Sequence, residues 1–346
     1  MGMQPVQRSP FMLADKQTIN TGNAAGVGRN AQVTFNPVLQ ENPQRGPYWL
    51  DEIRFYADGS AFQQLCYSEL LQARIMVGRY LLTHDFVPLR LLAPRFNQLP
   101  GQIASANLGT NASPDSSTVF RLDKPMWVAQ TDLVSIELRL DPNIVTTALL
   151  SNLGVTSFAF DVFAALICRS IASGTKRPKK MSIPYVAYWN SGLLPLGVKY
   201  QLRSTENDLK NPYAEPLRVT GLSGYLNFDF DDCNVPSANY NSVHGATGWQ
   251  MGALLNRDAV LRMHDSKGAM LIRDLTPFGQ VFHTRHGFWD FSCTMPPKSF
   301  YIVAPQIDLR DYVSQYATAV SPYMAIGLVG YHDVLLQGSM PPGDMG

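Results

Sequence analysis

The sequence has few charged residues and almost no net charge. Asp, Glu, Lys and Arg make up 16% of the 346 residues, and the formal net charge is +1. A typical globular domain has about a quarter of its residues charged. This chain therefore lacks a long-range field that would attract nucleic acid, a membrane surface or an acidic substrate. Any such contact must be local, and we expect no sequence-specific binding of nucleic acid.

Cysteine is also scarce. The four cysteines lie far apart, without a C-x-x-C pair, which argues against a zinc knuckle and against a small-domain disulfide framework. We expect four reduced and mostly buried thiols. They are Cys66, Cys168, Cys233 and Cys293.

Long apolar runs are missing as well. The longest, Val162–Cys168, has seven residues, whereas a membrane-spanning helix needs about 18 or more. The first residues, "MGMQPVQRSPFMLADKQ", lack the apolar region of a secretory signal peptide. We therefore expect a soluble protein made in the cytoplasm.

The histidines form no recognisable catalytic or metal-binding pattern. Three of the six precede an aspartate at expected strand ends or turns, where solvated polar residues are more typical than ligands. His283 and His286 are three apart, so an extended strand would send them to opposite faces instead of into one metal-binding barrel. The three dipeptides are His84-Asp85, His264-Asp265 and His332-Asp333.

Other motifs are incomplete. "GVGRNA" (Gly26–Ala31) matches G-x-G-x-x-A, but no buried strand precedes it and no helix opening follows. Asp229, Asp231 and Asp232 cluster in "DFDDCN", which lacks the turn glycine and terminal glutamate of a calcium loop, so ion binding there stays open. No G-x-S-x-G or P-loop motif occurs. We therefore expect a protein that is not an enzyme, with no catalytic residue, cofactor or metal.

Apolar and polar residues alternate with a period of two in several segments of the chain. In "LVSIELRL" (Leu133–Leu140) apolar residues occupy one face and polar residues the other, as in a half-buried strand. "YLNFDFD" (Tyr225–Asp231) repeats this pattern, whereas Ser157–Ser170 and Tyr323–Leu335 are apolar on nearly both faces, like interior strands. Such strands, punctuated by Pro, Gly, Asn and Asp, predict an all-β sandwich.

One segment departs from this pattern. "YSELLQARIMVGRYLL" (Tyr67–Leu82) has no proline, a capping residue in Ser68 and apolar residues at helical spacing, which predicts a helix of three or four turns. A strand interpretation of "ARIMVGRYLL" (Ala73–Leu82) remains the alternative.

Three ordered similarities between the two halves indicate an internal duplication. Each half has a hairpin, a proline-led aromatic strand and a closing buried strand, in the same order. The pairs are Asp51–Leu65 with Asp258–Leu275, Lys124–Leu138 with Pro296–Val313, and Phe158–Arg169 with Tyr323–Leu335. Chance similarity between β-hairpins is the competing explanation.

Domain boundaries follow from these patterns. Residues 1–32 are rich in Gly, Asn, Ala and Gln without periodicity, which predicts an extended N-terminal arm. We expect a first β domain over 33–172, a basic linker over 173–184, a second β domain over 185–340 and a C-terminal tail over 341–346.

The linker carries the one local cluster of cations. We interpret it first as a solvated connection between domains; the alternative is a contact with phosphate or with anionic lipid headgroups, at about 1 kcal/mol per cation. Its cations are Lys176, Arg177, Lys179 and Lys180.

Taken together, the arm, the two successive β domains, the hairpin "IRFYADGSAFQQL" and the proline-led aromatic strands resemble the double jelly-roll major capsid proteins of tailless, membrane-containing icosahedral viruses, the PRD1/adenovirus-like lineage. The resemblance implies two eight-stranded jelly rolls with one or a few short helices. It also implies a homotrimeric, pseudo-hexagonal capsomer in a virion shell, with neighbouring capsomers, penton or minor capsid proteins and internal membrane lipid as partners. A bacteriophage is the expected source.

Two alternatives remain. A spike or tail protein with tandem β-sandwiches would bind host glycan through exposed aromatic side chains, and an enzyme on a β scaffold would need a metal or a hydrolase site. The candidate sugar-stacking residues are Trp49, Trp189, Trp249 and Trp289, although large aromatics more often pack in a core.

Overall fold

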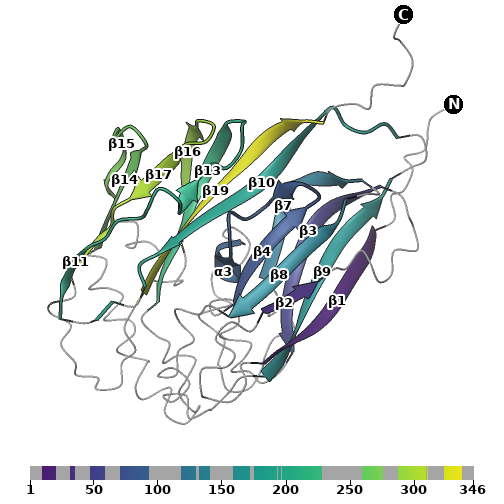
Figure 1. Cartoon of the computed structure of the whole chain (residues 1–346), viewed down its shortest axis with the longest axis horizontal. Coiled ribbons are helices and arrows are strands. Elements are labelled where there is room, and N and C mark those ends of the chain that lie inside the picture. Colours follow the sequence, from purple (N-terminus) through teal and green to yellow (C-terminus); the bar gives the residue numbers. More distant parts are fainter. Residues whose placement is uncertain are drawn as a thin grey trace, which may run out of the picture.

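The computed structural model is built almost entirely from β-strands (Figure 1). The one helix among the described residues is α3 (Leu89–Leu92), a single turn. No helix in this part of the chain is long and apolar enough to cross a membrane. The structure describes residues 10–20, 32–35, 47–58, 71–92, 118–129, 132–140, 159–171, 175–192, 194–195, 197–227, 259–275, 287–308, 310 and 323–336.

The first half of the chain forms two sheets that pack around one core. One sheet has the strand order β1-β9-β3-β7, and the other has the order β2-β8-β4-β5, with β6 paired to β4. All of these pairs are antiparallel. The strands are β1 (Pro10–Asn20), β2 (Gln32–Phe35), β3 (Tyr48–Asp58), β4 (Leu71–Val77), β5 (Tyr80–Leu81), β6 (Val87–Pro88), β7 (Thr118–Val128), β8 (Val134–Leu140) and β9 (Ala159–Ser170).

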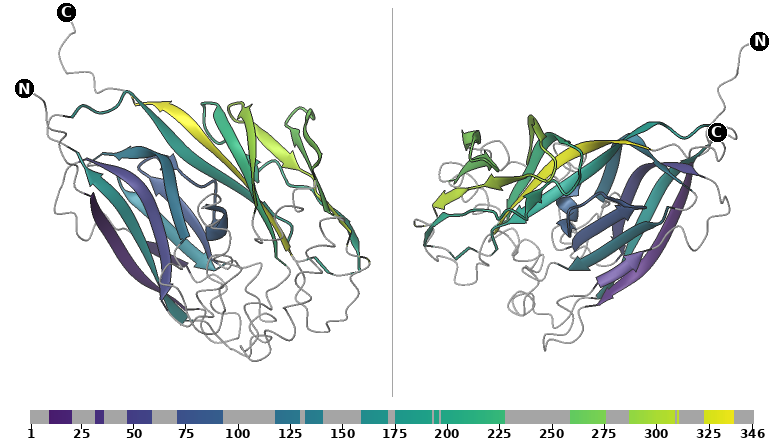
Figure 2. Two further views of the ribbon diagram at one scale, coloured as in Figure 1. Left: turned by 180° about the vertical axis from the view of Figure 1, so that it is seen from behind. Right: turned by 45° about the horizontal axis from the view of Figure 1, so that its top comes forward.

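The second half repeats this arrangement. Its sheets have the orders β10-β19-β13-β16 and β11-β18-β14-β17-β12, with β15 paired to β14. Figure 2 shows this second unit beside the first from two further directions. The strands are β10 (Lys180–Asn190), β11 (Lys199–Gln201), β12 (Leu209–Lys210), β13 (Leu217–Asn227), β14 (Ala259–Asp265), β15 (Met270–Leu275), β16 (Gly287–Met295), β17 (Phe300–Val303), β18 (Gln306–Asp308) and β19 (Tyr323–Leu335).

The two halves share one topology. In each, the opening strand (β1 or β10) pairs with the closing strand (β9 or β19), and the second strand (β2 or β11) pairs with β8 or β18. Two antiparallel sheets with this strand order, packed face to face, form a jelly roll. The chain is therefore a double jelly roll, and the predicted fold class is confirmed.

A matching irregularity supports the duplication. The register of β3 shifts between Leu50 and Glu52, and that of β13 shifts between Val219 and Gly221. The extra residue, Asp51 or Thr220, is the fourth residue of its strand in both cases. A β-bulge re-aims a side chain and bends its strand, so the two halves share a local distortion as well as a strand order.

The predicted correspondences hold in part. β9 and β19 are equivalent, and so are β8 and β18. The proline-led part of the second pair is wrong, because β7, which contains Lys124, corresponds to β16 and not to β17. The hairpin pairing is wrong: β14 and β15 do form a hairpin, with Gly268 at a φ of 83° in the turn, but β3 corresponds to β13, not to β14. Residues 59–65 lie outside the described part. Alternation shows that a segment is a strand, but it does not show to which sheet the strand belongs.

The predicted arm over 1–32 is wrong for residues 10–20. These residues form β1, which pairs with β9 along its full length, from Pro10 opposite Arg169 to Asn20 opposite Ala159. Ile19 is fully buried, and Lys16 lies 2.6 Å from Asp161. β1 lies at the edge of its sheet and pairs with one strand among the described residues, and its apolar pattern is correspondingly weak.

The predicted helix over Tyr67–Leu82 is also wrong within the described residues. Leu71–Val77 is β4, whose exposed Arg74 and Met76 alternate with buried residues. Gly78, at a φ of 55°, begins a two-residue turn into β5, and an added Cβ there would lie 2.8 Å from Asp132 Oδ1. The alternative strand interpretation of "ARIMVGRYLL" is thus correct, and a tight hairpin replaces the helix.

The predicted basic linker over 173–184 is shorter than expected, because β10 already begins at Lys180. Three residues of this strand, Met181, Ile183 and Val186, belong to the buried core of the first jelly roll. Tyr185, Ala187 and Trp189 belong to the core of the second. One strand therefore joins two cores, and the two jelly rolls pack as one body.

Hydrogen bonds also join the two jelly rolls where they meet along β10, a contact that we call the seam. Val186 N donates to Leu82 O at 2.9 Å, and His84 N donates to Val186 O at 2.8 Å. The Tyr213 hydroxyl donates to Leu81 O at 2.6 Å. These contacts satisfy buried polar groups, which are costly to leave unpaired.

The location of β1 predicts a clear difference between two substitutions. Ile19→Ala removes a fully buried side chain, so we expect it to lower the free energy of unfolding by about 2–4 kcal/mol. Met12→Ala, in the same strand but 58% exposed, should change it by less than about 0.5 kcal/mol. Urea unfolding of both variants measures this difference, and an Ile19→Ala variant as stable as the unmodified chain would restore the arm interpretation.

A buried histidine makes the seam sensitive to pH. His332 is fully buried, and its ring centroid lies 4.1 Å from that of Tyr213 and 5.5 Å from that of Tyr185. Neither ring nitrogen makes a hydrogen bond of normal geometry with the described residues. Burial lowers the pKa of His332 to about 4, opposed in part by the backbone of Pro216. The fold therefore holds the neutral imidazole.

Acidification should accordingly destabilise the protein. Because the folded-state pKa of His332 lies below the unfolded value of about 6.5, its contribution is intact above pH 6.5 and is lost as the pH falls towards 4. The loss amounts to about 3 kcal/mol. Between pH 6.5 and pH 4, the melting temperature of His332→Phe should fall less steeply than that of the unmodified chain. The control His264→Gln should show the same fall as the unmodified chain. If the melting temperatures of the unmodified chain and both variants fall equally, the assignment to His332 is refuted.

Candidate functional site

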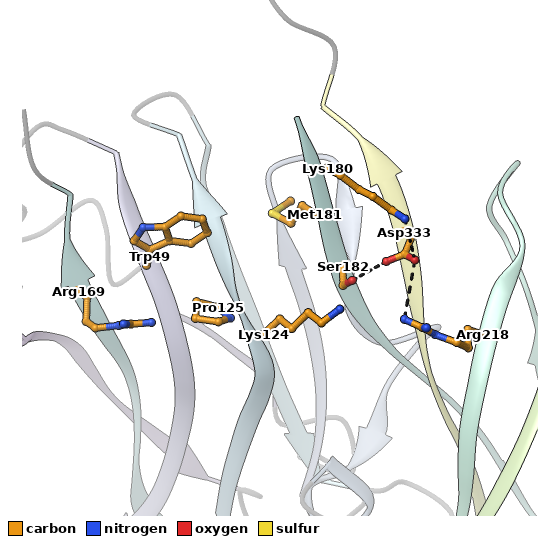
Figure 3. Close-up of a pocket in the computed structure, with 9 residues that line it drawn as sticks. All are labelled: Trp49, Lys124, Pro125, Arg169, Lys180, Met181, Ser182, Arg218 and Asp333. Atoms are coloured by element: carbon orange, nitrogen blue, oxygen red, sulfur yellow. Dashed lines mark hydrogen bonds and ion pairs between the residues drawn. The ribbon is translucent and has the colours of Figure 1, made fainter. Parts of the chain in front are cut away.

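A hollow of about 490 Å³ opens at the seam between the two jelly rolls (Figure 3). Strands of the first half supply one wall, and the beginning of β10, the beginning of β13 and the end of β19 supply the other. Its volume falls within the usual range for small-ligand sites, about 300–1,000 Å³. The lining residues are Trp49, Lys124, Pro125, Arg169, Lys180, Met181, Ser182, Arg218 and Asp333.

On the first-half wall, Arg169 forms a two-pronged ion pair with Asp51. The Nε–Oδ2 and Nη2–Oδ1 distances are both 2.6 Å, and this pairing raises the pKa of Arg169. The bulge in β3 places Asp51 at this point of the sheet. Lys124 is exposed and forms no salt bridge within the described residues.

On the second-half wall, Asp333 is the centre of a small network. The Ser182 hydroxyl donates to Asp333 Oδ1, Lys180 Nζ lies 3.2 Å from Oδ2, and Arg218 Nη2 lies 3.8 Å from the same oxygen. These groups lower the pKa of Asp333, with the Ser182 hydrogen bond as the largest cause. Asp333 therefore stays ionised at neutral pH.

Cations outnumber carboxylates at this site. Among the described residues, four cationic side chains meet two carboxylates, those of Asp51 and Asp333, which leaves two positive charges in excess. Figure 3 shows cations approaching from both walls. The excess is local, because the whole chain carries only +1. The arrangement suits an anion and disfavours a metal cation.

Only one of the four sequence-predicted cations reaches the hollow. Lys180 lines it, whereas Lys176, Arg177 and Lys179 are exposed on the segment before β10 and do not. Sequence reasoning missed the three others, which lie far apart in the chain: Lys124, Arg169 and Arg218. No spacing rule links them, since strand pairing alone brings them together.

The other sequence candidates lie elsewhere. His84 borders the seam, and His264 lies on β14. The described residues contain no group of three side chains suited to hold a metal ion. Asp229, Asp231 and Asp232 lie outside the described part of the chain.

The two described tryptophan side chains among those proposed for sugar stacking, Trp49 and Trp189, do not share an exposed surface. Trp189 is only 7% exposed and belongs to the second core. Trp49 packs edge-on against Trp127, with ring centroids 5.2 Å apart, and lines the hollow. Trp249 lies outside the described residues, as does the side chain of Trp289.

Comparison with known proteins gives no sequence relative. No family model matches the chain, and no curated protein matches it.

Some solved structures share its general arrangement. The crystal structure of the major capsid protein of STIV is 9% identical over 93% of this chain and 97% of that chain, with a TM-score of 0.42. PBCV-1 VP54, fitted into a reconstruction of the virophage Sputnik, is 10% identical over 97% and 100%, with a TM-score of 0.47. A chain of Sulfolobus Turreted Icosahedral Virus is 9% identical over 93% and 90%, with a TM-score of 0.45. With TM-scores below 0.5, the fold assignment rests on the strand order of this chain itself, which is that of a double jelly roll.

Proposed function

We propose that this chain is a major capsid protein, a non-catalytic subunit that self-assembles into an icosahedral virion shell. The observation that carries the proposal is the fusion of two jelly rolls of one strand order through a shared strand, β10. A single chain thereby presents two similar building blocks held in a fixed relation.

A chain with two similar jelly rolls is suited to build a hexagonal tile. Three identical chains around a threefold axis would present six similar jelly rolls, which make a pseudo-hexagonal tile. Such tiles cover a large surface with one kind of subunit. The formal net charge of +1 suits tiles that must meet edge to edge, because neighbouring copies repel one another little.

The sheet edges also favour association. β1 ends one four-stranded sheet and β16 ends the other, at the edges opposite β7 and β10. β1 is an eleven-residue strand that carries the exposed Met12. Long edge strands tend to pair with or be covered by other chains. We place such edges at contacts between subunits in the shell.

The proposal extends to partners. It includes a homotrimer, neighbouring capsomers, penton or minor capsid proteins, and location in the virion. The exposed linker cations Lys176, Arg177 and Lys179 are proposed to face phosphate groups of an internal membrane or of other polyanions. Their location beside the paired ends of β10 and β19 supports a common exposed region.

Assembly of the purified chain tests the proposal. We expect sedimentation velocity to show a species of three times the chain mass as concentration rises, and negative-stain images to show six-lobed hexagonal outlines. Folding is followed in parallel by near-ultraviolet circular dichroism, so that aggregation of unfolded chain is not mistaken for assembly. A folded monomer over the whole concentration range contradicts the proposal, and so does a trimer without six lobes.

A further inference from the structure

We propose that the hollow at the seam binds a phosphate-bearing anion that bridges the two jelly rolls. The site is built from both halves: Lys124 and Arg169 come from β7 and β9, and Lys180 and Arg218 come from β10 and β13. An anion that enters between these four cations, which Figure 3 shows on both walls, would contact both units at once.

The cations retain capacity for such a ligand. Asp333 takes up only part of the hydrogen-bonding capacity of its neighbours, since an ammonium group has three donors and a guanidinium group has five. The Arg218 guanidinium lies 3.8 Å from Asp333 Oδ2, which is too long for a direct hydrogen bond. Lys124 has no carboxylate partner within the described residues. Free donors therefore face the hollow from both walls.

The shape of the donor set favours phosphate. A phosphate group offers several acceptor oxygens pointing in different directions, which suits cations that converge from two walls. A guanidinium group can donate two parallel hydrogen bonds to phosphate oxygens, and an ammonium group attracts phosphate as a point charge. Trp49, Pro125 and Met181 add an apolar surface to the lining, against which the organic part of a phosphorylated ligand can pack.

The excess positive charge of the lining favours an anionic ligand. An anion that enters the hollow is attracted by the cations of both walls. The two carboxylates offset two of the four charges, and the ligand would offset the rest. This inference does not depend on capsid assembly, because a chain that remains monomeric has the same hollow.

Calorimetric titration of the full chain with inorganic pyrophosphate at low ionic strength tests the site. We expect saturable binding with one ligand per chain. Lys124→Gln should raise the Kd about fivefold, because removing one cation near a phosphate has an effect of that size. This substitution breaks no ion pair within the described residues, so the melting temperature without ligand should not change.

Lys176→Gln is the matched control. It removes the same charge from an exposed lysine of the linker, outside the hollow, so the Kd should equal that of the unmodified chain. Absence of saturable binding would overturn the inference. Equal weakening in the two variants would also overturn it, because the attraction would then be diffuse and not located in the hollow.

Vesicles distinguish the source of the phosphate. Co-flotation is measured with phosphatidylglycerol vesicles and with phosphatidylcholine vesicles as the uncharged reference. If Lys124→Gln weakens flotation and pyrophosphate competes, the hollow takes a lipid headgroup. If flotation is absent or follows Lys176 alone while pyrophosphate binding follows Lys124, the ligand of the hollow is a soluble phosphate compound.

Discussion

The structure depends on the burial of β10 on both of its faces. Val186 lies in the first core, whereas Tyr185, Ala187 and Trp189, on the opposite face of the strand, lie in the second. Each fully buried apolar side chain contributes about 1.5–3 kcal/mol, so separating the jelly rolls would expose part of both cores. The double unit therefore behaves as a single body, and this rigidity is what a fixed-geometry tile requires.

The sequence of β10 reflects this double role. An almost continuous apolar run is typical of a strand covered on both sides, and residues 181–187 are all buried. Pro184 lacks a backbone N–H, which is tolerated because β10 is the terminal strand of its own sheet. At the same seam, an added Cβ on Gly327 would lie 3.3 Å from Leu91 Cδ1, so glycine allows α3 to approach β19 closely.

Much of the fold could be predicted from period-two patterns, because each long strand that faces one core must alternate. Val134–Leu140 shows this clearly, with every second residue buried. The pattern failed where other constraints dominate. Among the residues of β1 whose side chains the structure describes, Asp15 and Ile19 are buried, and a charged residue at a buried position interrupts the apolar stripe. The segment that forms β4 also fits a helix, because its length and lack of proline suit either structure; the turn at Gly78 decides between them.

The candidate site was much less predictable than the fold. A run of cations such as Lys176–Lys180 is visible in sequence, yet only Lys180 lines the hollow. Lys124, Arg169 and Arg218 become neighbours through long-range strand pairing, which local sequence does not encode.

The same pairing explains why positive charge can gather at the seam. Repulsion between exposed cations is weak in water, on the order of 1 kcal/mol at contact distance, whereas the cores joined by β10 contribute several buried apolar side chains. Hydrophobic burial therefore holds the cations together against their repulsion. A fold stabilised by its cores can keep an anion site preorganised, because the ligand need not supply the energy that brings the two halves into contact.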